Sequence, residues 1–260
     1  MKFFLSLMLI TTVILYTGIC QAEVNPCDVK IGSHNLVTPI PRPDLDWWMP
    51  RHQAVIDSVK QGNVDLLMIG DSITHRWENF GKQMWDKYYA GRNAVNMGFG
   101  GDGTQQVLWR IQNGEIDGIK PKLAVVLIGT NNSGDPNASV EQIADGIKAI
   151  ICQLRTKLPE TKVLILAIFP RGDDEQMKKQ LPDAVFNPHW AKNNEISKLV
   201  SKIADKKMIF YLDINKKFLN KKGVFTQEVT PDLVHLSEKG YQIWAEAMEP
   251  TIVKLMGEKK

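Results

Sequence analysis

Five short and largely apolar runs recur along the chain, and stretches with helical spacing of apolar residues separate them. The runs lie at residues 64–69, 94–97, 123–128, 162–168 and 208–212. The helical patterns lie at residues 51–61, 104–112, 140–157, 189–204 and 237–256, and Pro250 is expected to interrupt or kink the last of them. Short apolar strands that alternate with helices indicate a parallel sheet covered on both faces, which is the α/β class.

The N-terminal segment has the pattern of a secretory signal peptide. Residues 1–22 begin with Lys2, continue as an apolar run and end at the small residue Ala22. We expect cleavage near Ala22, a secreted or periplasmic mature protein, and no stable membrane anchor. A lipoprotein acylated at Cys20 is the weaker alternative, because Thr-Gly-Ile before that cysteine lacks the usual aliphatic and small residues.

The rest of the chain has a length that suits one compact domain. Residues 23–49 are rich in proline and polar residues, and the three alternating prolines of residues 39–43 exclude a helix or a central strand. We therefore predict an extended surface arm over residues 23–49, followed by a single α/β domain over residues 50–260.

Charge and cysteine content exclude two classes of function. The formal net charge is only +3, and the basic residues are dispersed, so nucleic acid binding has no support. Cys27 and Cys152, the two cysteines after the signal segment, make neither a disulfide framework nor a metal-ligand cluster. A disulfide between them remains open, but Cys152 lies in an apolar helical pattern, and buried packing is the preferred interpretation.

The apolar run at residues 64–69 ends abruptly in Gly70-Asp71-Ser72. A strand that stops at a glycine presents the next side chains at the carboxyl edge of the sheet, where α/β proteins build their sites. Ser72 is therefore a candidate nucleophile. Near the other end of the chain, the spacing of Asp232 and His235 lets a carboxylate and an imidazole share one turn, which completes a candidate triad.

Each part of this triad has a structural alternative. Gly-Asp-Ser is common in turns, and Asp-x-x-His is mostly a solvated turn or a helix cap. His75, one turn after Ser72, is an alternative base, but the sequence places no carboxylate to orient it. The conjunction of all three residue types is what favours the catalytic interpretation.

The second predicted strand leads into a glycine-rich segment, residues 98–103, that matches G-x-G-x-x-G. A dinucleotide site would also need an acidic residue at the end of the next strand, where residues 129–132 read Gly-Thr-Asn-Asn instead. Flexible backbone beside a nucleophile can point an amide hydrogen at a developing oxyanion, and a carboxamide at the next strand end can add a donor.

These blocks together resemble the GDSL, or SGNH, hydrolase family. The resemblance runs through residues 70–72, residues 96–102, residues 129–132 and the Asp232/His235 pair, and covers about residues 66–256. Further matches at residues 107–110 and 167–172 are similar to the branch that contains the intracellular platelet-activating-factor acetylhydrolase catalytic subunits. The chain lacks G-x-S-x-G, which excludes the usual α/β-hydrolase nucleophile elbow.

The resemblance implies a fold and a set of roles. The family fold is a flavodoxin-like three-layer α/β/α sandwich with about five parallel strands. Ser72 would be the nucleophile, His235 the base and Asp232 its orienting acid. The backbone amides of Ser72 and Gly101 and the side-chain amide of Asn131 would form the oxyanion hole.

The expected function is a secreted serine esterase that removes short acyl groups, acetyl above all, from a small acyl ester or an acetylated glycan. No cofactor and no metal are expected. Trp47, Trp48 and Trp190 are candidates for stacking on sugar rings, although packing in the core or the arm is the simpler interpretation of each. The alternative from another class is a non-catalytic carbohydrate-binding protein on the same fold.

Overall fold

The computed structural model of the protein describes Cys27 and residues 32–259. The predicted signal peptide at residues 1–22 and most of the first part of the arm lie outside the described residues. No helix in the described part of the chain is long and apolar enough to cross a membrane.

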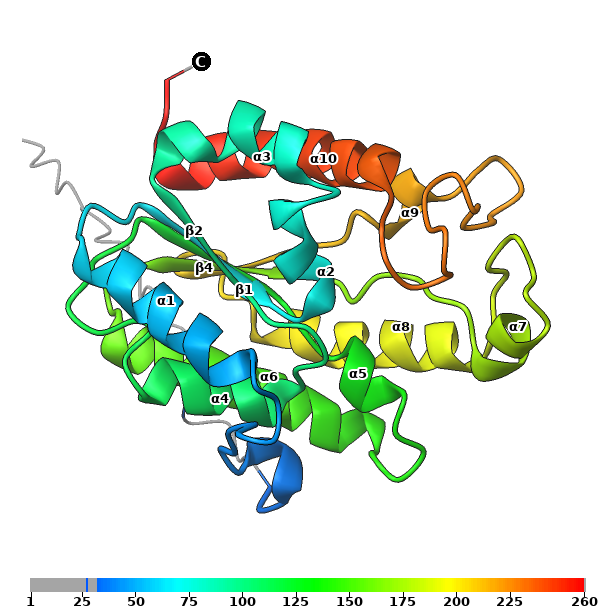
Figure 1. The fold of residues 1–260 in the computed structure, drawn as a ribbon, viewed down its shortest axis with the longest axis horizontal. Coiled ribbons are helices and arrows are strands. Elements are labelled where there is room, and N and C mark those ends of the chain that lie inside the picture. The colour runs from blue at the N-terminus through cyan, green and yellow to red at the C-terminus, as the bar shows by residue number, and fades with distance from the viewer. Residues whose placement is uncertain (1–26, 28–31, 260) are drawn as a thin grey trace, which may run out of the picture.

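The centre of the molecule is a five-stranded parallel sheet (Figure 1), and its strands are β1 (Leu66–Gly70), β2 (Ala94–Gly98), β3 (Leu123–Leu127), β4 (Lys162–Leu166) and β5 (Ile209–Leu212). All five strands overlap the predicted apolar runs. The strand order is β2-β1-β3-β4-β5, which is the flavodoxin-like order. In this order β1 has β2 on one side and β3 on the other. The strand that follows β1 is thus added on one side of it, and the later strands are added on the other side.

Helices cover both faces of the sheet (Figure 1). One layer holds α1 (Trp48–Lys60), α4 (Thr104–Gln112), α6 (Val140–Lys157) and α8 (Pro188–Val200). The other holds α3 (Lys82–Tyr88) and α10 (Glu238–Met256). The α/β/α sandwich that the sequence predicted is confirmed. The bounds of α4 and α6 agree with the prediction, and α10 continues through Pro250, so the expected interruption does not occur.

Short helices follow several strands and connect the layers: α2 (Ser72–His75), α5 (Thr130–Ser133), α7 (Asp174–Lys178) and α9 (Asn215–Phe218), with 3-10 turns η1 (Asn35–Val37), η2 (Arg76–Glu78), η3 (Ala90–Arg92) and η4 (Ser201–Ile203). Hydrophobic periodicity did not reveal these elements, because one helical turn is too short to carry it.

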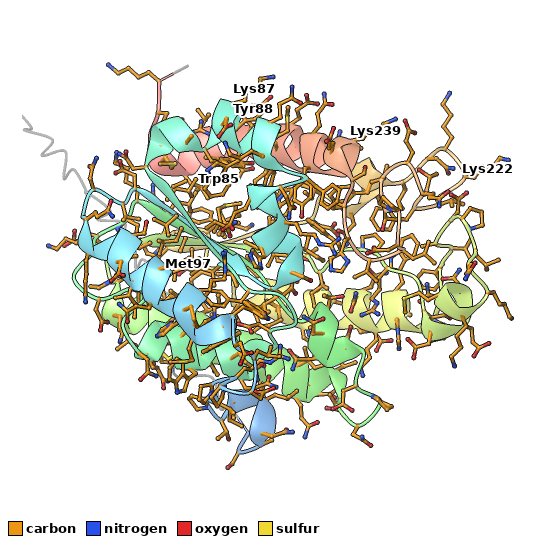
Figure 2. All side chains as sticks on the ribbon, viewed as in Figure 1. Trp85, Lys87, Tyr88, Met97, Lys222 and Lys239 are labelled. Atoms are coloured by element: carbon orange, nitrogen blue, oxygen red, sulfur yellow. A yellow bond between two sulfur atoms is a disulfide. The ribbon has the colours of Figure 1, made fainter. Side chains whose placement is uncertain are left out.

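Each face of the sheet has its own hydrophobic core. Along β1, Leu67 and Ile69 face the layer of α1, α4, α6 and α8, whereas Leu66 and Met68 face α3 and α10. All four side chains are buried, which is why this strand reads as an unbroken apolar run. In Figure 2 the side chain of Met97 lies within the body of the molecule.

The arm before α1 is attached to the domain rather than merely lying on it. Cys27 forms a disulfide with Cys152 of α6, so the interpretation of Cys152 as packing alone is wrong. The side chain of Leu36 is buried in the core, and α1 begins at Trp48, three residues before the predicted helix. The arm runs along α6, where the backbone of Gly32 donates to Asp145, and sequence periodicity carries no sign of this pairing.

Candidate active site

The nucleophile candidate lies on a tight turn at the carboxyl end of β1. Gly70 ends the strand, and a Cβ atom there would lie 2.2 Å from Thr74 Oγ1 and 2.4 Å from the carbonyl oxygen of Leu127. Only glycine fits this approach. Asp71 then caps α2, because its Oδ1 accepts a hydrogen bond of 2.9 Å from the backbone N–H of Ile73. Ser72 follows as the first residue of α2 and is half-buried.

The two other triad candidates share one turn before α10. Asp232 Oδ1 accepts from the backbone N–H groups of Val234 at 3.1 Å and of His235 at 2.6 Å. Leu233, which lies between Asp232 and Val234, has a φ of 64°, a left-handed conformation that non-glycine residues rarely adopt. The carbonyl oxygen of Leu233 accepts a hydrogen bond of 2.7 Å from Gly172 N, so the loop after β4 holds this turn in place.

The structure brings these two turns into contact. His235 Nε2 lies 2.8 Å from Ser72 Oγ across 163 positions of sequence, and His235 Nδ1 lies 2.7 Å from Asp232 Oδ2. An ionised carboxylate only accepts hydrogen bonds, so the Nδ1 side of the ring carries the proton. In the neutral ring Nε2 is then the acceptor, ready to take the hydroxyl proton of Ser72.

The charge of Asp232 is set by its donors. Burial by itself raises the pKa of this carboxyl, but hydrogen bonds from the His235 side chain and from the two backbone amides outweigh burial and hold the pKa at about 2. The carboxylate therefore stays ionised at every pH at which a histidine is neutral.

The residues predicted to bind an oxyanion come from the two strands on either side of β1. Gly101, in the loop after β2, has a φ of 76°, which glycine adopts without strain. Asn131 lies on α5 after β3, and its Nδ2 donates to the backbone carbonyl of Asp102 at 2.8 Å. Gly101 and Asn131 line the same cavity of about 330 Å³. The amide of Asn131 has a second N–H, which can donate to a bound oxygen.

A buried chain of charged groups supports the loop after β2, and the sequence analysis did not identify it. Asp102 accepts from Arg110 Nε at 2.9 Å, Arg110 donates on to Glu115 at 2.5 Å, and His52 Nδ1 lies 2.8 Å from Glu115. Trp48 Nε1 also donates to Asp102 at 2.8 Å. Asp102, Arg110 and Glu115 are completely buried. Arg110, which is charged although it lies within the apolar pattern of α4, was the only sequence signal for this network.

The alternative base, His75, does not contact Ser72 through any hydrogen bond in the described structure. His75 Nε2 lies 3.7 Å from Glu78 Oε2. The sequence had placed no carboxylate beside His75. Burial and then the nearby guanidinium of Arg51 lower the pKa of His75. Its ring lies beside that of Trp47, with 5.9 Å between the ring centroids.

The three tryptophans considered for sugar stacking differ in exposure. Trp48 is fully buried, and only 5% of Trp190 is exposed, but Trp47 is 40% exposed. The structure therefore agrees with core packing for Trp48 and Trp190 and leaves Trp47 partly exposed beside His75.

Known proteins are similar to this chain in sequence. The model of the GDSL-like Lipase/Acylhydrolase family matches residues 68–243, which include the nucleophile turn and the base turn. The chain belongs to this family. It is 32% identical over 212 residues to the human platelet-activating factor acetylhydrolase IB subunit alpha1, covering 81% of this chain and 85% of the relative.

Solved structures agree on the fold of this family member. A GDSL-like lipase from Bacteroides thetaiotaomicron superposes with a TM-score of 0.59 at 16% identity, covering 80% of this chain and 96% of the other. An acetylxylan esterase from Geobacillus stearothermophilus has a TM-score of 0.56 at 17% identity, covering 76% and 96%. The protein is therefore a GDSL-family acylhydrolase, a hydrolase of carboxylic esters.

Proposed function

We propose that this acylhydrolase is a serine esterase that removes acetyl groups from carbohydrate hydroxyls through a covalent acyl-enzyme. The observation that carries the mechanism is the continuous set of hydrogen bonds from Ser72 Oγ through His235 to Asp232. Such a set activates a serine, which is otherwise a weak nucleophile.

In the first half-reaction Ser72 Oγ bonds to the ester carbonyl carbon while His235 Nε2 takes the serine proton. The carbonyl oxygen becomes an oxyanion, which the backbone N–H groups of Ser72 and Gly101 and the free N–H of Asn131 stabilise. The intermediate collapses, the bond to the alcohol oxygen breaks, and the alcohol leaves with the proton from His235. Water then attacks the carbonyl carbon of the acyl-serine while His235 takes its proton. The second intermediate collapses, acetate leaves, and the proton from His235 restores the serine hydroxyl.

The cavity beside Gly101 and Asn131 supports a polyhydroxylated alcohol as the leaving group. Side-chain amides and charged groups line most of it, and the residues are Asn35, Leu36, Arg42, Gly101, Gly103, Gln105, Gln106, Asn131, Asn132 and Asp135. Amide side chains both donate and accept hydrogen bonds, as hydroxyl groups do.

The human relative supports acetyl as the group removed, and two proteins of similar fold support a carbohydrate as its carrier. The human relative is an acetylhydrolase, and the proteins of similar fold include the acetylxylan esterase and a carbohydrate acetylesterase from Sinorhizobium meliloti. The signal peptide pattern and the Cys27–Cys152 disulfide support action outside the cytoplasm, because disulfides persist in oxidising compartments.

Two assays test this proposal. The purified protein is given p-nitrophenyl acetate, butyrate and octanoate, and acetate release from acetylated xylan is followed separately, with Ser72→Ala as the control. We expect kcat/KM to fall at least about tenfold from acetate to octanoate, and acetate release from xylan only with intact Ser72. A preference for octanoate, or no release from acetylated glycans, would remove the carbohydrate deacetylase assignment.

A further inference from the structure

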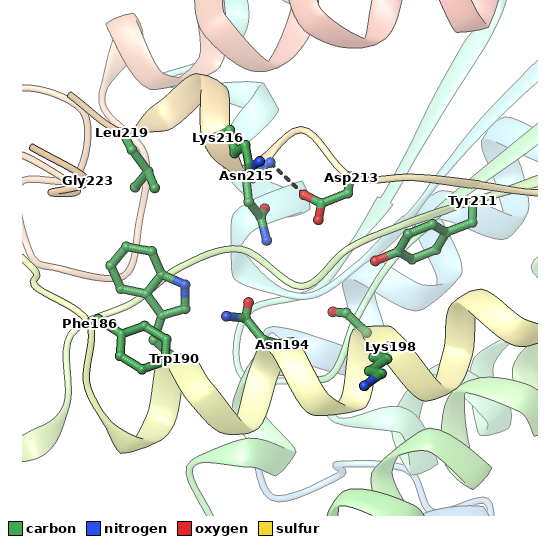
Figure 3. A pocket seen from close by; sticks show the side chains of 11 residues that line it. Phe186, Trp190, Asn194, Lys198, Tyr211, Asp213, Asn215, Lys216, Leu219 and Gly223 are labelled. Atoms are coloured by element: carbon green, nitrogen blue, oxygen red, sulfur yellow. Dashed lines mark hydrogen bonds between the residues drawn. The ribbon is translucent and has the colours of Figure 1, made fainter. Parts of the chain in front are cut away.

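A second cavity lies between α8 and the segment from β5 to α9 (Figure 3). It has a volume of about 420 Å³, within the range of small-molecule sites, and its lining residues are Phe186, Trp190, Asn194, Ser197, Lys198, Tyr211, Asp213, Asn215, Lys216, Leu219 and Gly223. None of them belongs to the triad or to the oxyanion positions. The esterase mechanism leaves this cavity without a role.

One end of this cavity is aromatic. Phe186 and Trp190 lie with ring centroids 5.7 Å apart and planes inclined by 56°, and Leu219 lies opposite them (Figure 3). Phe186 is 65% exposed, more than any other exposed large hydrophobic residue in the described part of the chain. An aromatic side chain held at the edge of a pocket offers a flat apolar face to a ligand.

The other end of the cavity is polar. Figure 3 shows Asn194 on α8 opposite Asn215 and Asp213, with the hydroxyl of Tyr211 beside them. The amide of Asn215 is fixed because its Nδ2 donates to the carbonyl oxygen of Ile168 at 3.0 Å. Its Oδ1 is buried and has no hydrogen-bond partner among the described residues, although such groups are normally satisfied.

The charges at this cavity are mixed. Lys198 and Lys216 contribute two positive charges, and Asp213 contributes one negative charge. Asp213 Oδ1 already accepts a hydrogen bond of 2.9 Å from the backbone of Asn215, and its other oxygen remains available. This lining favours a ligand with hydroxyl groups over a strongly charged one.

We propose that this cavity is a second carbohydrate-binding site, in which a neutral sugar ring packs its C–H face on Phe186, whose ring lies beside the buried Trp190. Its hydroxyls hydrogen-bond to the side chains of Asn194 and Asp213, beside the unpartnered Oδ1 of Asn215. Such a site holds a glycan chain at a position separate from the triad. The proposal does not depend on ester hydrolysis, because it concerns binding alone.

Calorimetric titration with oligosaccharides that carry no ester tests this site. The full chain is titrated with xylotetraose, cellotetraose and chitotetraose, and we expect at least one of them to bind. Phe186→Ala and Asn194→Ala remove exposed side chains, so the fold is retained, and each should weaken binding about tenfold or more. Hydrolysis of p-nitrophenyl acetate should be unchanged in both variants.

Phe80→Ala is the matched control, because Phe80 is also an exposed phenylalanine, at 47%, but lies over Arg76 near Asp232. It should leave oligosaccharide binding unchanged. Binding that is lost in Phe80→Ala and kept in Phe186→Ala would place the glycan at the triad and overturn the proposal. No binding of any of the three probes at millimolar concentration would overturn it as well.

Discussion

The nucleophile turn (residues 70–75) and the base turn (residues 231–236) each contain an aspartate close in sequence to the proposed nucleophile or base, but the two carboxyl groups are in opposite states. Asp71 is completely buried, and desolvation raises its pKa to about 7. Asp232 is half-exposed, and its pKa is about 2. One carboxyl carries its proton over much of the acidic range, and the other is ionised at any pH well above 2.

The difference follows first from burial, which is complete for Asp71 and partial for Asp232, and then from the number of donors that each carboxyl receives. Asp71 accepts one backbone N–H at Oδ1, its Oδ2 is buried without a partner, and the nearby charge of Asp102 adds repulsion that Arg171 only partly offsets. Asp232 receives two backbone N–H groups and the ring of His235. Closeness to a proposed catalytic residue therefore does not decide the charge of a carboxyl, whereas its burial and its set of hydrogen bonds do.

The largest expected effect comes from breaking the contact between the two turns. Ser72→Ala and His235→Ala should each lower kcat about 10⁴-fold or more, and the double variant should be scarcely slower, because the residues act as a unit. Steady-state kinetics on p-nitrophenyl acetate measures this. Retention of more than about a tenth of the activity by either single variant would contradict the triad.

The next test compares the two aspartates through the same conservative change. Asp232→Asn should lower kcat about 10³- to 10⁴-fold, because an amide favours the wrong tautomer of His235. Asp71→Asn keeps the oxygen that caps Ile73 and should change kcat less than about tenfold. Equal losses in the two variants would mean that Asp71 also takes part in the chemistry.

A smaller loss is expected at the oxyanion position. Asn131→Ala should lower kcat about 10²- to 10³-fold with little change in KM, because the amide bonds the charge that appears only in the tetrahedral intermediate. The melting temperature is measured with kcat. Lower stability with unchanged kcat would show that Asn131 only ties α5 to the Asp102 carbonyl.

The smallest effect is on stability and concerns the proton on Asp71. In the unfolded chain this carboxyl ionises near its ordinary pKa of 3.8, but in the folded protein it does so only near pH 7. Its contribution to stability is therefore complete below about pH 4 and is lost as the pH rises through 7. Asp71→Asn removes that loss and should be more stable than the natural protein at pH 8, by at most about 4 kcal/mol.

Thermal melts of both proteins at pH 4 and pH 8 measure this difference. The gap in melting temperature should be clearly larger at pH 8. A gap that does not depend on pH would mean that Asp71 is ionised in the folded protein across this range.

The sequence by itself predicted the strands and long helices of the α/β fold, and those parts of the candidate site that lie within one short segment. Strands buried on both faces must be apolar throughout, so all five strands were visible as runs, and long amphipathic helices such as α4 and α6 were visible in full. Asp232 and His235 also belong to one turn, so their spacing alone predicted that they could share a hydrogen bond, which the structure contains.

Only the tertiary structure decided the contacts between distant segments. The bond from His235 to Ser72, the disulfide from Cys27 to Cys152, and the buried bond from Trp48 to Asp102 join residues whose proximity depends on strand order and helix packing. The difference in burial between Asp71 and Asp232 also contributed to their different pKa values. Local sequence fixes neither the neighbours of a side chain nor its loss of water, and those two quantities set the charge of each carboxyl.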